Sequence, residues 1–350
     1  MTTEPLSTWS RILGLEMSPS GTGPRHLGDS DAESRAVLGG DAVCPLTDMG
    51  AIHAAGPDAI SFVHGQITND VASLDDVHGI VAAYCNAQGR MLALFRVLRS
   101  DDGLLLLTRR ELIPGLIKRL GLFVLRAKVT LMDASSRFVA IGLTGPRAAD
   151  TLAPWGLTPA LEPDGAIHRQ GSHIVRLSGT TPRYLLWTEI DRAQETWRAL
   201  QAHAKPVGLD AWRLLDIRTG TPSVYPQTRE AWVPQMVNLQ LLNGISFSKG
   251  CYPGQEIIAR LHYRGQLKRR MSRITLQGGG IPSPGDEIRT LDGAEAGQIV
   301  DAVAGPEGGA EALAVLRIEC EAKHLTVGKS RARVVELPRE GHAGSAGTVR

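Results

Sequence analysis

The apolar residues of this chain occur mostly in short runs bounded by turn-forming residues, a pattern that predicts β-strands. Helical spacing appears over residues 112–120 and 192–202 and again after Gly254. The strands predicted between residues 50 and 190 are 51–55, 80–85, 91–98, 104–108, 122–132, 138–143, 173–177 and 184–188. Residues 86–89, Asn-Ala-Gln-Gly, separate two of these strands and predict a hairpin turn.

A weak internal repeat accompanies this pattern. Gly56-Pro57-Asp58-Ala59 follows one apolar run, and Gly145-Pro146-Arg147-Ala148 follows another, 89 residues further along the chain. Both sites predict a strand, a tight turn and a helix that begins near a proline, where the missing N–H costs nothing. The repeat favours two related α+β lobes of ferredoxin-like type. A chance likeness of two Gly-Pro turns would explain the same observation.

The pattern of apolar and turn-forming residues changes after Arg270. Short strands are predicted at residues 274–276, 287–290, 298–303 and 313–318, and turns rich in glycine and proline separate them. Evenly spaced turns of this kind are typical of a small antiparallel barrel. We therefore predict an α+β protein with two ferredoxin-like lobes followed by a C-terminal antiparallel β-barrel.

The same changes of pattern predict the domain boundaries. Residues 18–40 are rich in serine, glycine, proline and aspartate and show little periodicity, which indicates a loop or extension. We expect an N-terminal extension over residues 1–40, an α+β region over 41–265 that divides near residue 135, a barrel over 266–338, and a flexible glycine-rich tail over 339–350.

Composition narrows the class of protein. The 350 residues are 43% hydrophobic and 21% charged, as in ordinary globular proteins. The formal net charge of +2 gives no electrostatic footprint for broad nucleic-acid binding, and the basic cluster Lys268–Arg270 is more typical of a solvated face. The N-terminus lacks a signal-peptide pattern, and no run approaches the roughly 20 apolar residues of a membrane span. We therefore expect a cytoplasmic protein with no direct nucleic-acid or membrane partner.

The cysteines divide into two kinds. Cys44, Cys85 and Cys320 lie in apolar, strand-like runs, which is typical of cysteines in a core. Cys251 instead lies among glycines, a lysine and a Gln-Glu pair. No CxxC pair or zinc-ligand spacing connects the four, so we expect neither a disulfide framework nor a metal site.

Cys251 is the strongest candidate for chemistry. Gly250 and Gly254 allow the backbone around it to turn sharply, and a helix is predicted from Gln255 to Gly265. The partial positive charge at a helix N-terminus favours a thiolate, and Lys249 adds a second positive charge. We interpret Cys251 as a functional thiol tuned by Lys249. The alternative is a small buried hydrophobic residue.

Two further places carry weaker signals. Asn69 and Asp70 end the segment Gly65–Asp70 with groups that can bind backbone or ligand, although both residue types also form ordinary turns. Trp212 has helical neighbours, which indicates packing in a core. A flat indole can also stack on a heterocycle such as a pterin.

The block Lys249-Gly250-Cys251-Tyr252-Pro253-Gly254-Gln255-Glu256 resembles the YgfZ-type folate-binding proteins. These share a superfamily with the glycine-cleavage T-protein, an aminomethyltransferase, and with mitochondrial iron–sulfur assembly factors. Supporting matches stand at Pro234-Gln235, Asn238-Leu239, Ala259-Arg260, Tyr263-Arg264-Gly265, Gly65–Val71 and Gly89–Leu92. The resemblance runs from about Asp41 to Ile318.

The resemblance implies three subdomains arranged as a ring around a central channel, with the cysteine loop facing the channel. It also implies binding of tetrahydrofolate and support of iron–sulfur enzymes, including the radical enzymes that methylthiolate tRNA. Lys249 and Cys251 fall at the family's functional Lys and Cys positions, and Trp212 looks like an aromatic associated with folate. The other residues expected to bind folate or shape the channel are Asn69, Asp70, Tyr252, Gln255, Glu256 and Arg260.

Three departures from the superfamily bear on the chemistry. Where the T-proteins carry an acidic pair, this chain has Arg90-Met91-Leu92-Ala93, which offers no carboxylate for acid–base work. Met49 falls at a second aromatic position. Arg218 falls where a glutamate receives the pterin ring, and arginine has only donors. Asp216 or Glu256 is the candidate replacement.

We therefore predict a folate-dependent accessory protein for iron–sulfur cluster assembly or repair. A one-carbon transferase acting on a small amine is the first alternative, and a non-catalytic scaffold for partner proteins is the second. Binding of tetrahydrofolate separates the scaffold from the other two.

Overall fold

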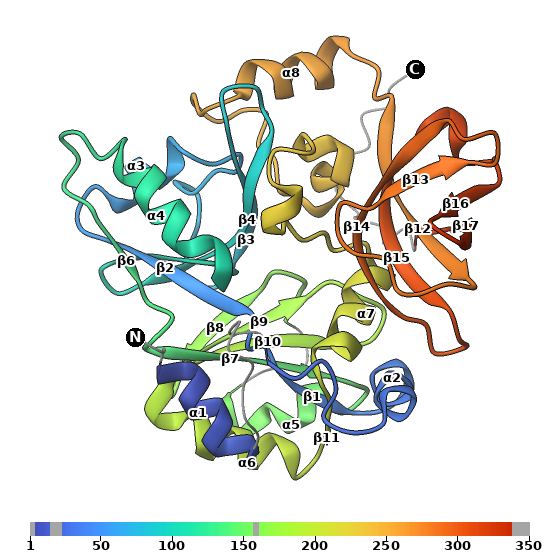
Figure 1. Ribbon diagram of the computed structural model, residues 1–350. Coiled ribbons are helices and arrows are strands. Elements are labelled where there is room, and N and C mark those ends of the chain that lie inside the picture. The colour runs from blue at the N-terminus through green and yellow to red at the C-terminus, as the bar shows by residue number, and fades with distance from the viewer. Residues whose placement is uncertain (1–3, 15–22, 157–160, 338–350) are drawn as a thin grey trace.

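The computed structural model describes residues 4–14, 23–156 and 161–337. Residues 1–3 and 15–22 of the predicted extension and the whole predicted tail lie outside these ranges. Two β-sheets with flanking helices and a closed C-terminal barrel make up the fold (Figure 1). The predicted α+β class and C-terminal antiparallel barrel are confirmed.

The helices are α1 Glu4–Leu13, α2 Ser30–Gly39, α3 Ala59–His64, α4 Ile113–Gly121, α5 Ala148–Thr151, α6 Ala193–Gln201, α7 Leu209–Thr219 and α8 Gln255–Arg264. The strands are β1 Ala42–Pro45, β2 Met49–Ala55, β3 Ile80–Cys85, β4 Met91–Ser100, β5 Gly103–Arg109, β6 Thr130–Asp133, β7 Phe138–Thr144, β8 Ala166–Arg169, β9 Ser172–Leu177, β10 Arg183–Glu189, β11 Lys205–Pro206, β12 Arg269–Gln277, β13 Glu287–Thr290, β14 Glu295–Ala304, β15 Ala310–Arg317, β16 Leu325–Val327 and β17 Ser330–Val335.

The first sheet has the strand order β3-β4-β5-β2-β6, and all neighbours are antiparallel. The turn between β3 and β4 is the predicted hairpin. Asn86 organises it, because its side-chain oxygen accepts the N–H groups of Gln88 and Arg90. Gly89 has φ 72°, a conformation that favours glycine.

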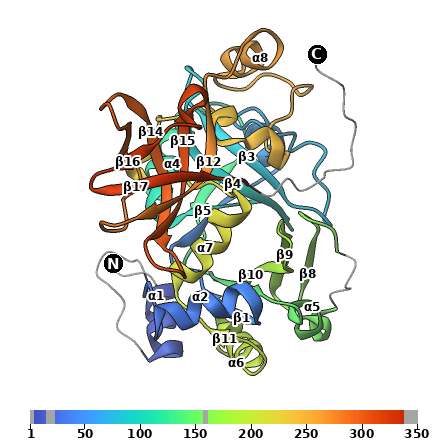
Figure 2. The same ribbon diagram turned by 90° about the vertical axis from the view of Figure 1, so that its right-hand side faces the viewer.

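The second sheet has the strand order β11-β1-β7-β10-β9-β8. Strand β1 precedes the first sheet in the chain but pairs with β7 and β11 of the second. The chain therefore starts in the second sheet, builds the whole of the first, and then returns. Helices α5 and α6 belong to the second unit, and α1 packs near α6 (Figure 2).

The predicted internal repeat is confirmed. Strand β7 begins and ends 89 residues after β2, and α5 likewise begins 89 residues after α3. Between strand and helix, Gly56 and Gly145 have φ 122° and 133°, which side chains rarely adopt. Both glycines also donate their N–H across the sheet end, to Asp102 and Pro182 respectively.

Changing Gly145 to alanine is expected to destabilise the protein by about 2 kcal/mol or more. An added Cβ would lie 2.4 Å from Asp41 Oδ1 and 2.5 Å from the Asp41 Cα, in addition to the backbone strain. Urea unfolding measures the change. Gly115→Ala in α4 is the matched control, because no heavy atom outside its own stretch of helix lies within 4 Å of its added Cβ. Equal stability of the two variants would contradict this account of the turn.

The barrel closes in the order β12-β15-β14-β13-β16-β17. Its inward side chains form their own apolar cluster, including Ile274, Ile299 and Leu316. Helix α7 contacts β14 and β15 on one side and β1 and α2 on the other, so it links the barrel to the second sheet (Figure 2).

Two local predictions were wrong. Residues 30–39, predicted as loop, form α2, because Asp29 accepts the Ala32 N–H as a cap and Glu33 accepts the N–H groups of Leu27, Gly28 and Gly208. Residues 122–132, predicted as one strand, form strand only from Thr130. The apolar run before it has no neighbouring strand, and Leu122 and Leu125 are 70% and 89% exposed.

Candidate functional site

A cavity of about 180 Å³ lies where the two sheets meet α7 and the segment after it. Its apolar wall comes from β4, β5 and β10 and from the chain near Val224 and Leu239. Its polar lining is Asp48, Arg96, Thr108, Arg109, Asp164, Ser178, Arg183, Arg213, Asp216, Thr221 and Ser223. The cavity is therefore an apolar slot with charged groups placed around it.

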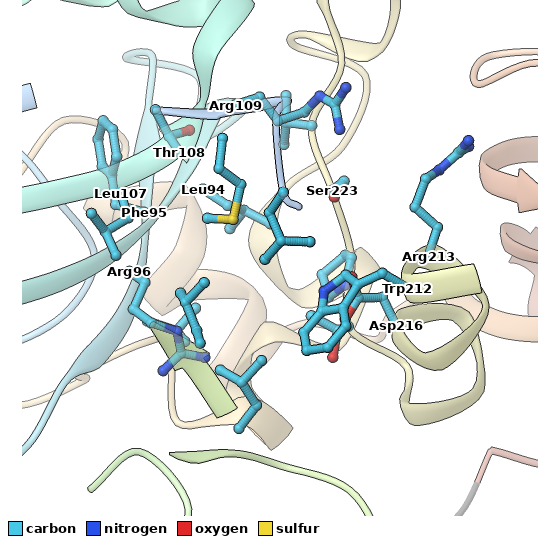
Figure 3. A pocket seen from close by; sticks show the side chains of 18 of the residues that line it. Leu94, Phe95, Arg96, Leu107, Thr108, Arg109, Trp212, Arg213, Asp216 and Ser223 are labelled. Atoms are coloured by element: carbon cyan, nitrogen blue, oxygen red, sulfur yellow. The ribbon is translucent and has the colours of Figure 1, made fainter. Parts of the chain in front are cut away.

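Trp212 and Asp216 stand one helical turn apart on the face of α7 that lines the cavity (Figure 3). The indole is 5% exposed and rests against Gly142 of β7, where an added Cβ would lie 2.5 Å from the ring. Glycine at that position leaves room for the ring against the sheet. Leu94, Phe95 and Leu107 form the opposite wall (Figure 3).

Each charged lining group has an opposite charge close by. Arg183 donates to Asp216 at 2.6 Å, Arg109 to Asp48 at 3.0 Å, and Arg96 to Asp164 at 2.5 Å. Burial raises the pKa of the Asp216 carboxyl, and the Arg183 guanidinium acts against this rise. Because 22% of the Asp216 side chain is exposed, and Asp216 lines the cavity, the carboxylate is available to a ligand there.

These groups fit the pterin end of a folate. The indole and the apolar wall suit a flat heterocycle, and the half-buried Asp216 carboxylate suits its N–H donors. Pockets for complete drug-sized ligands commonly measure about 300–1,000 Å³. The cavity of about 180 Å³ is smaller than this, so the ring system is the part of a folate that it could enclose.

Two of the family departures are placed by the structure. Met49, the first residue of β2, lines the cavity. Arg218 forms a bidentate pair with Glu311 of β15, with Nη2–Oε1 at 2.5 Å, so it fastens α7 to the barrel. Arg218 is not among the residues that line the cavity. Asp216, one turn away from Trp212, offers the carboxylate that Arg218 cannot.

The cysteine loop lies at a different place. Cys251 is exposed, while Cys44, Cys85 and Cys320 are buried. The loop packs on residues 64–70 and on the β3–β4 turn, where Gly254 faces Gly89 so closely that an added Cβ would lie 2.5 Å from the Gly89 Cα. None of residues 249–256, all described, is among the cavity-lining residues. The structure therefore does not show the loop facing this cavity.

Lys249 turns away from the solvent. Its side chain is buried, and Nζ donates to the carbonyls of His64 and Ile67 and stands 4.9 Å from the centroid of the Tyr252 ring. Burial lowers the pKa of Lys249 to about 8, and Asp70 acts against this shift. The ammonium group therefore holds the loop onto the end of α3.

Some of the other predicted site residues support the cysteine loop, and the rest lie on helix α8. Asn69 donates to the carbonyls of Val81 and Asn243, and Asp70 accepts the N–H groups of Ala72 and Ser73, so both organise the segments beneath the loop. On α8, Glu256 and Arg260 are exposed and Gln255 is half-buried. Of the predicted binding residues only Trp212 lines the cavity.

The sequence interpretation missed most of the cavity. Arg96, Arg109 and Arg183 lie on three strands from two sheets, and no local motif marks them. Single arginines in apolar strands were the available signal, because a buried arginine requires a partner.

The fold is that of an aminomethyltransferase. The crystal structure of glycine cleavage system aminomethyltransferase T from Bartonella henselae matches with a TM-score of 0.74 over 97% of each chain. At 18% sequence identity this likeness establishes the fold alone.

The sequence relatives are more specific. The tRNA-modifying protein YgfZ of Klebsiella pneumoniae (strain 342) is 34% identical over 246 residues, which is 69% of this chain and 74% of the relative. The same-named proteins of Edwardsiella ictaluri and Colwellia psychrerythraea are 35% and 34% identical and are covered to 68% and 71%. No family model matches the chain. On these relatives, the chain belongs to the YgfZ family of tRNA-modifying proteins.

Two features are absent from the described residues. No helix among them is long and apolar enough to cross a membrane. Nor do three or more His, Cys, Asp or Glu side chains gather there as a possible metal site.

Proposed function

We propose that this protein is a cytoplasmic, folate-binding accessory factor for iron–sulfur cluster assembly or repair, and that it supports enzymes that methylthiolate tRNA. The observation that carries the proposal is the cavity of Trp212 and Asp216, whose groups match a pterin. The relatives named tRNA-modifying proteins support the link to tRNA. Iron–sulfur enzymes are the proposed partners.

In this proposal two ferredoxin-like lobes and the barrel form a ring, and tetrahydrofolate occupies its centre. Trp212 stacks on the pterin, and Asp216 accepts its N–H groups. The arginines around the cavity, each already paired with an aspartate, set the local charge. Tetrahydrofolate, when bound, supplies a carrier of one-carbon units.

Cys251 is the proposed functional thiol, either redox-active or in contact with a cluster. Its exposure suits a partner protein, because a docked enzyme could reach it directly. Lys249 has a positioning role, since its ammonium group fixes the loop to α3. Asn69, Asp70 and Tyr252 support the loop, and Gln255, Glu256 and Arg260 shape the adjoining surface of α8.

Aminomethyl transfer is not supported as the function. At the place of the T-protein acidic pair, Met91 and Leu92 are 1% and 0% exposed. Arg90 donates to the Ala231 carbonyl at 2.6 Å and so anchors the hairpin to the chain before the cysteine loop. Met91 and Leu92 therefore pack in the core and Arg90 makes a structural hydrogen bond, and the stretch has no carboxylate for acid–base catalysis.

Calorimetry with tetrahydrofolate tests the proposal. We expect the wild-type protein to bind, and Asp216→Asn to bind about tenfold more weakly or worse, because the amide has one acceptor oxygen where the carboxylate has two, and its NH2 cannot accept a second pterin N–H. Glu256→Gln is the matched control, since Glu256 is exposed outside the cavity, and it should bind like the wild type. Absence of binding by the wild-type protein would refute the folate proposal and favour the scaffold.

A further inference from the structure

The segment between α4 and β6 has the apolar pattern of a strand but exposes its largest side chains. Leu122, Phe123 and Leu125 are 70%, 45% and 89% exposed, and Met132 in β6 is 45% exposed. Figure 1 shows this segment at the outer edge of the molecule, on the left. Several large apolar side chains exposed along one short segment are typical of a surface that another molecule covers.

Strand β6 is also an open edge of the first sheet. It pairs with β2 on one side, and no described strand pairs with its other side. The Ala134 N–H donates to the Ala51 carbonyl. Hydrogen-bonded and non-hydrogen-bonded pairs alternate in an antiparallel ladder, so the backbone of Met132 points at β2 and that of Leu131 and Asp133 points outward. These outward N–H and C=O groups can receive another strand.

The charge of this region is positive. Residues 112–132 contain two lysines, two arginines and neither aspartate nor glutamate. Three of the four cations are exposed, namely Lys118, Arg126 and Lys128. Asp58 and Asp133 border the run, and their carboxylates accept the N–H groups of Lys128 and Ser135. The exposed cations therefore suit a partner that brings negative charge.

These observations separate three kinds of occupant. A lipid surface has no backbone groups for the open edge, and unpaired N–H and C=O groups are costly in hydrocarbon. A second copy of this chain would place like charges opposite each other, which disfavours pairing. An extended protein segment with alternating apolar and acidic side chains supplies backbone partners, apolar contacts and carboxylates together.

We propose that residues 122–133, the docking edge, bind an extended acidic segment of a partner protein by strand addition. The added strand hydrogen-bonds to the outward backbone groups of Leu131 and Asp133. Its apolar side chains cover the exposed ones of the docking edge, and its carboxylates lie near Arg126 and Lys128. No residue of the docking edge lines the Trp212 cavity, so the surface is separate from the proposed folate site.

The probe is a synthetic peptide of about eight residues in which valine and glutamate alternate, labelled with fluorescein. The control peptide has lysine in place of every glutamate. Fluorescence anisotropy with the full chain should show binding of the acidic peptide with a Kd below about 1 mM, and at least about tenfold weaker binding of the basic one. No binding of the acidic peptide, or equal binding of the two, would overturn the proposal.

Hydrogen–deuterium exchange tests the mode of binding. The outward amides of Leu131 and Asp133 lack a partner strand, so they should exchange quickly in the free protein and at least about fivefold more slowly with the acidic peptide at saturation. Slowing should be confined to the docking edge. Peptide binding that leaves exchange over residues 130–133 unchanged would rule out strand addition.

Reversing the charge with Arg126→Glu and Lys128→Glu together should weaken binding of the acidic peptide about tenfold or more. Leu125→Glu is a second variant, and its 89% exposure leaves the fold unaffected. The matched control is Arg331→Glu with Arg333→Glu in β17, an exposed pair on a strand whose two edges are both paired. It should bind the peptide like the wild type.

The other occupants are outcomes of the same set of proteins. Binding to anionic lipid vesicles in place of the peptide, lost in Leu125→Glu, would overturn the proposal in favour of a membrane. A dimer in sedimentation that Leu125→Glu dissociates would overturn it in favour of a second copy. The docking-edge variants should bind tetrahydrofolate like the wild type, so failure of this proposal is distinguishable from failure of the folate proposal.

Discussion

Replacing Trp212 by leucine is expected to weaken tetrahydrofolate binding roughly 10- to 100-fold, because stacking of a heterocycle on an aromatic side chain contributes about 1–3 kcal/mol. Leucine keeps an apolar surface against Gly142 but lacks a flat face for the ring. Calorimetry with tetrahydrofolate measures the change. Binding equal to that of the wild type would place the ligand elsewhere in the molecule.

Trp212 is also part of the core, so the loss of binding must be separated from a loss of stability. Large-to-small changes at buried positions commonly cost about 2–5 kcal/mol. Trp155→Leu is the matched control, because Trp155 packs against the separate apolar cluster of the second sheet and does not line the cavity. It should lose stability and keep its affinity for tetrahydrofolate.

Replacing Cys251 by serine is expected to reduce the supporting activity in cells at least about tenfold, because a serine hydroxyl at neutral pH supplies neither a thiolate nucleophile nor a soft ligand. The readout is the fraction of methylthiolated nucleoside in tRNA from cells that depend on this protein. Since Cys251 is exposed, the free energy of unfolding should change by less than about 0.5 kcal/mol.

Ser248→Ala is the control for this experiment, since Ser248 is an exposed residue of the same loop without a thiol. It should retain full activity. Full activity of Cys251→Ser would remove the thiol from the proposed function, while leaving the folate cavity untouched as a separate question.

Local sequence patterns predicted the elements well where the signal depends on neighbours in the chain. The structure contains the predicted Gly-Pro turns at Gly56 and Gly145 and the predicted hairpin at Gly89. These turns could be predicted because each needs a positive φ, which glycine adopts far more readily than other residues. Helix α8 begins at Gln255 and ends at Arg264, as the glycines around it predicted. The pattern gave wrong predictions at two places. At residues 30–39 the helix depends on the hydrogen bonds that Glu33 accepts from distant backbone N–H groups. At residues 122–129 no neighbouring strand is present to pair with the apolar run.

The sequence alone thus located the cysteine loop and indicated the fold class and the family resemblance, because all three depend on residues that are contiguous in the chain. Only the tertiary structure decided where the chemistry lies. It turned Lys249 towards the carbonyls of His64 and Ile67 and paired Arg218 with Glu311. It also placed Asp216 beside Trp212 in the cavity lining and set Cys251 outside that cavity. The partner of a charged side chain depends on which distant strands and helices pack together, and no local pattern records that.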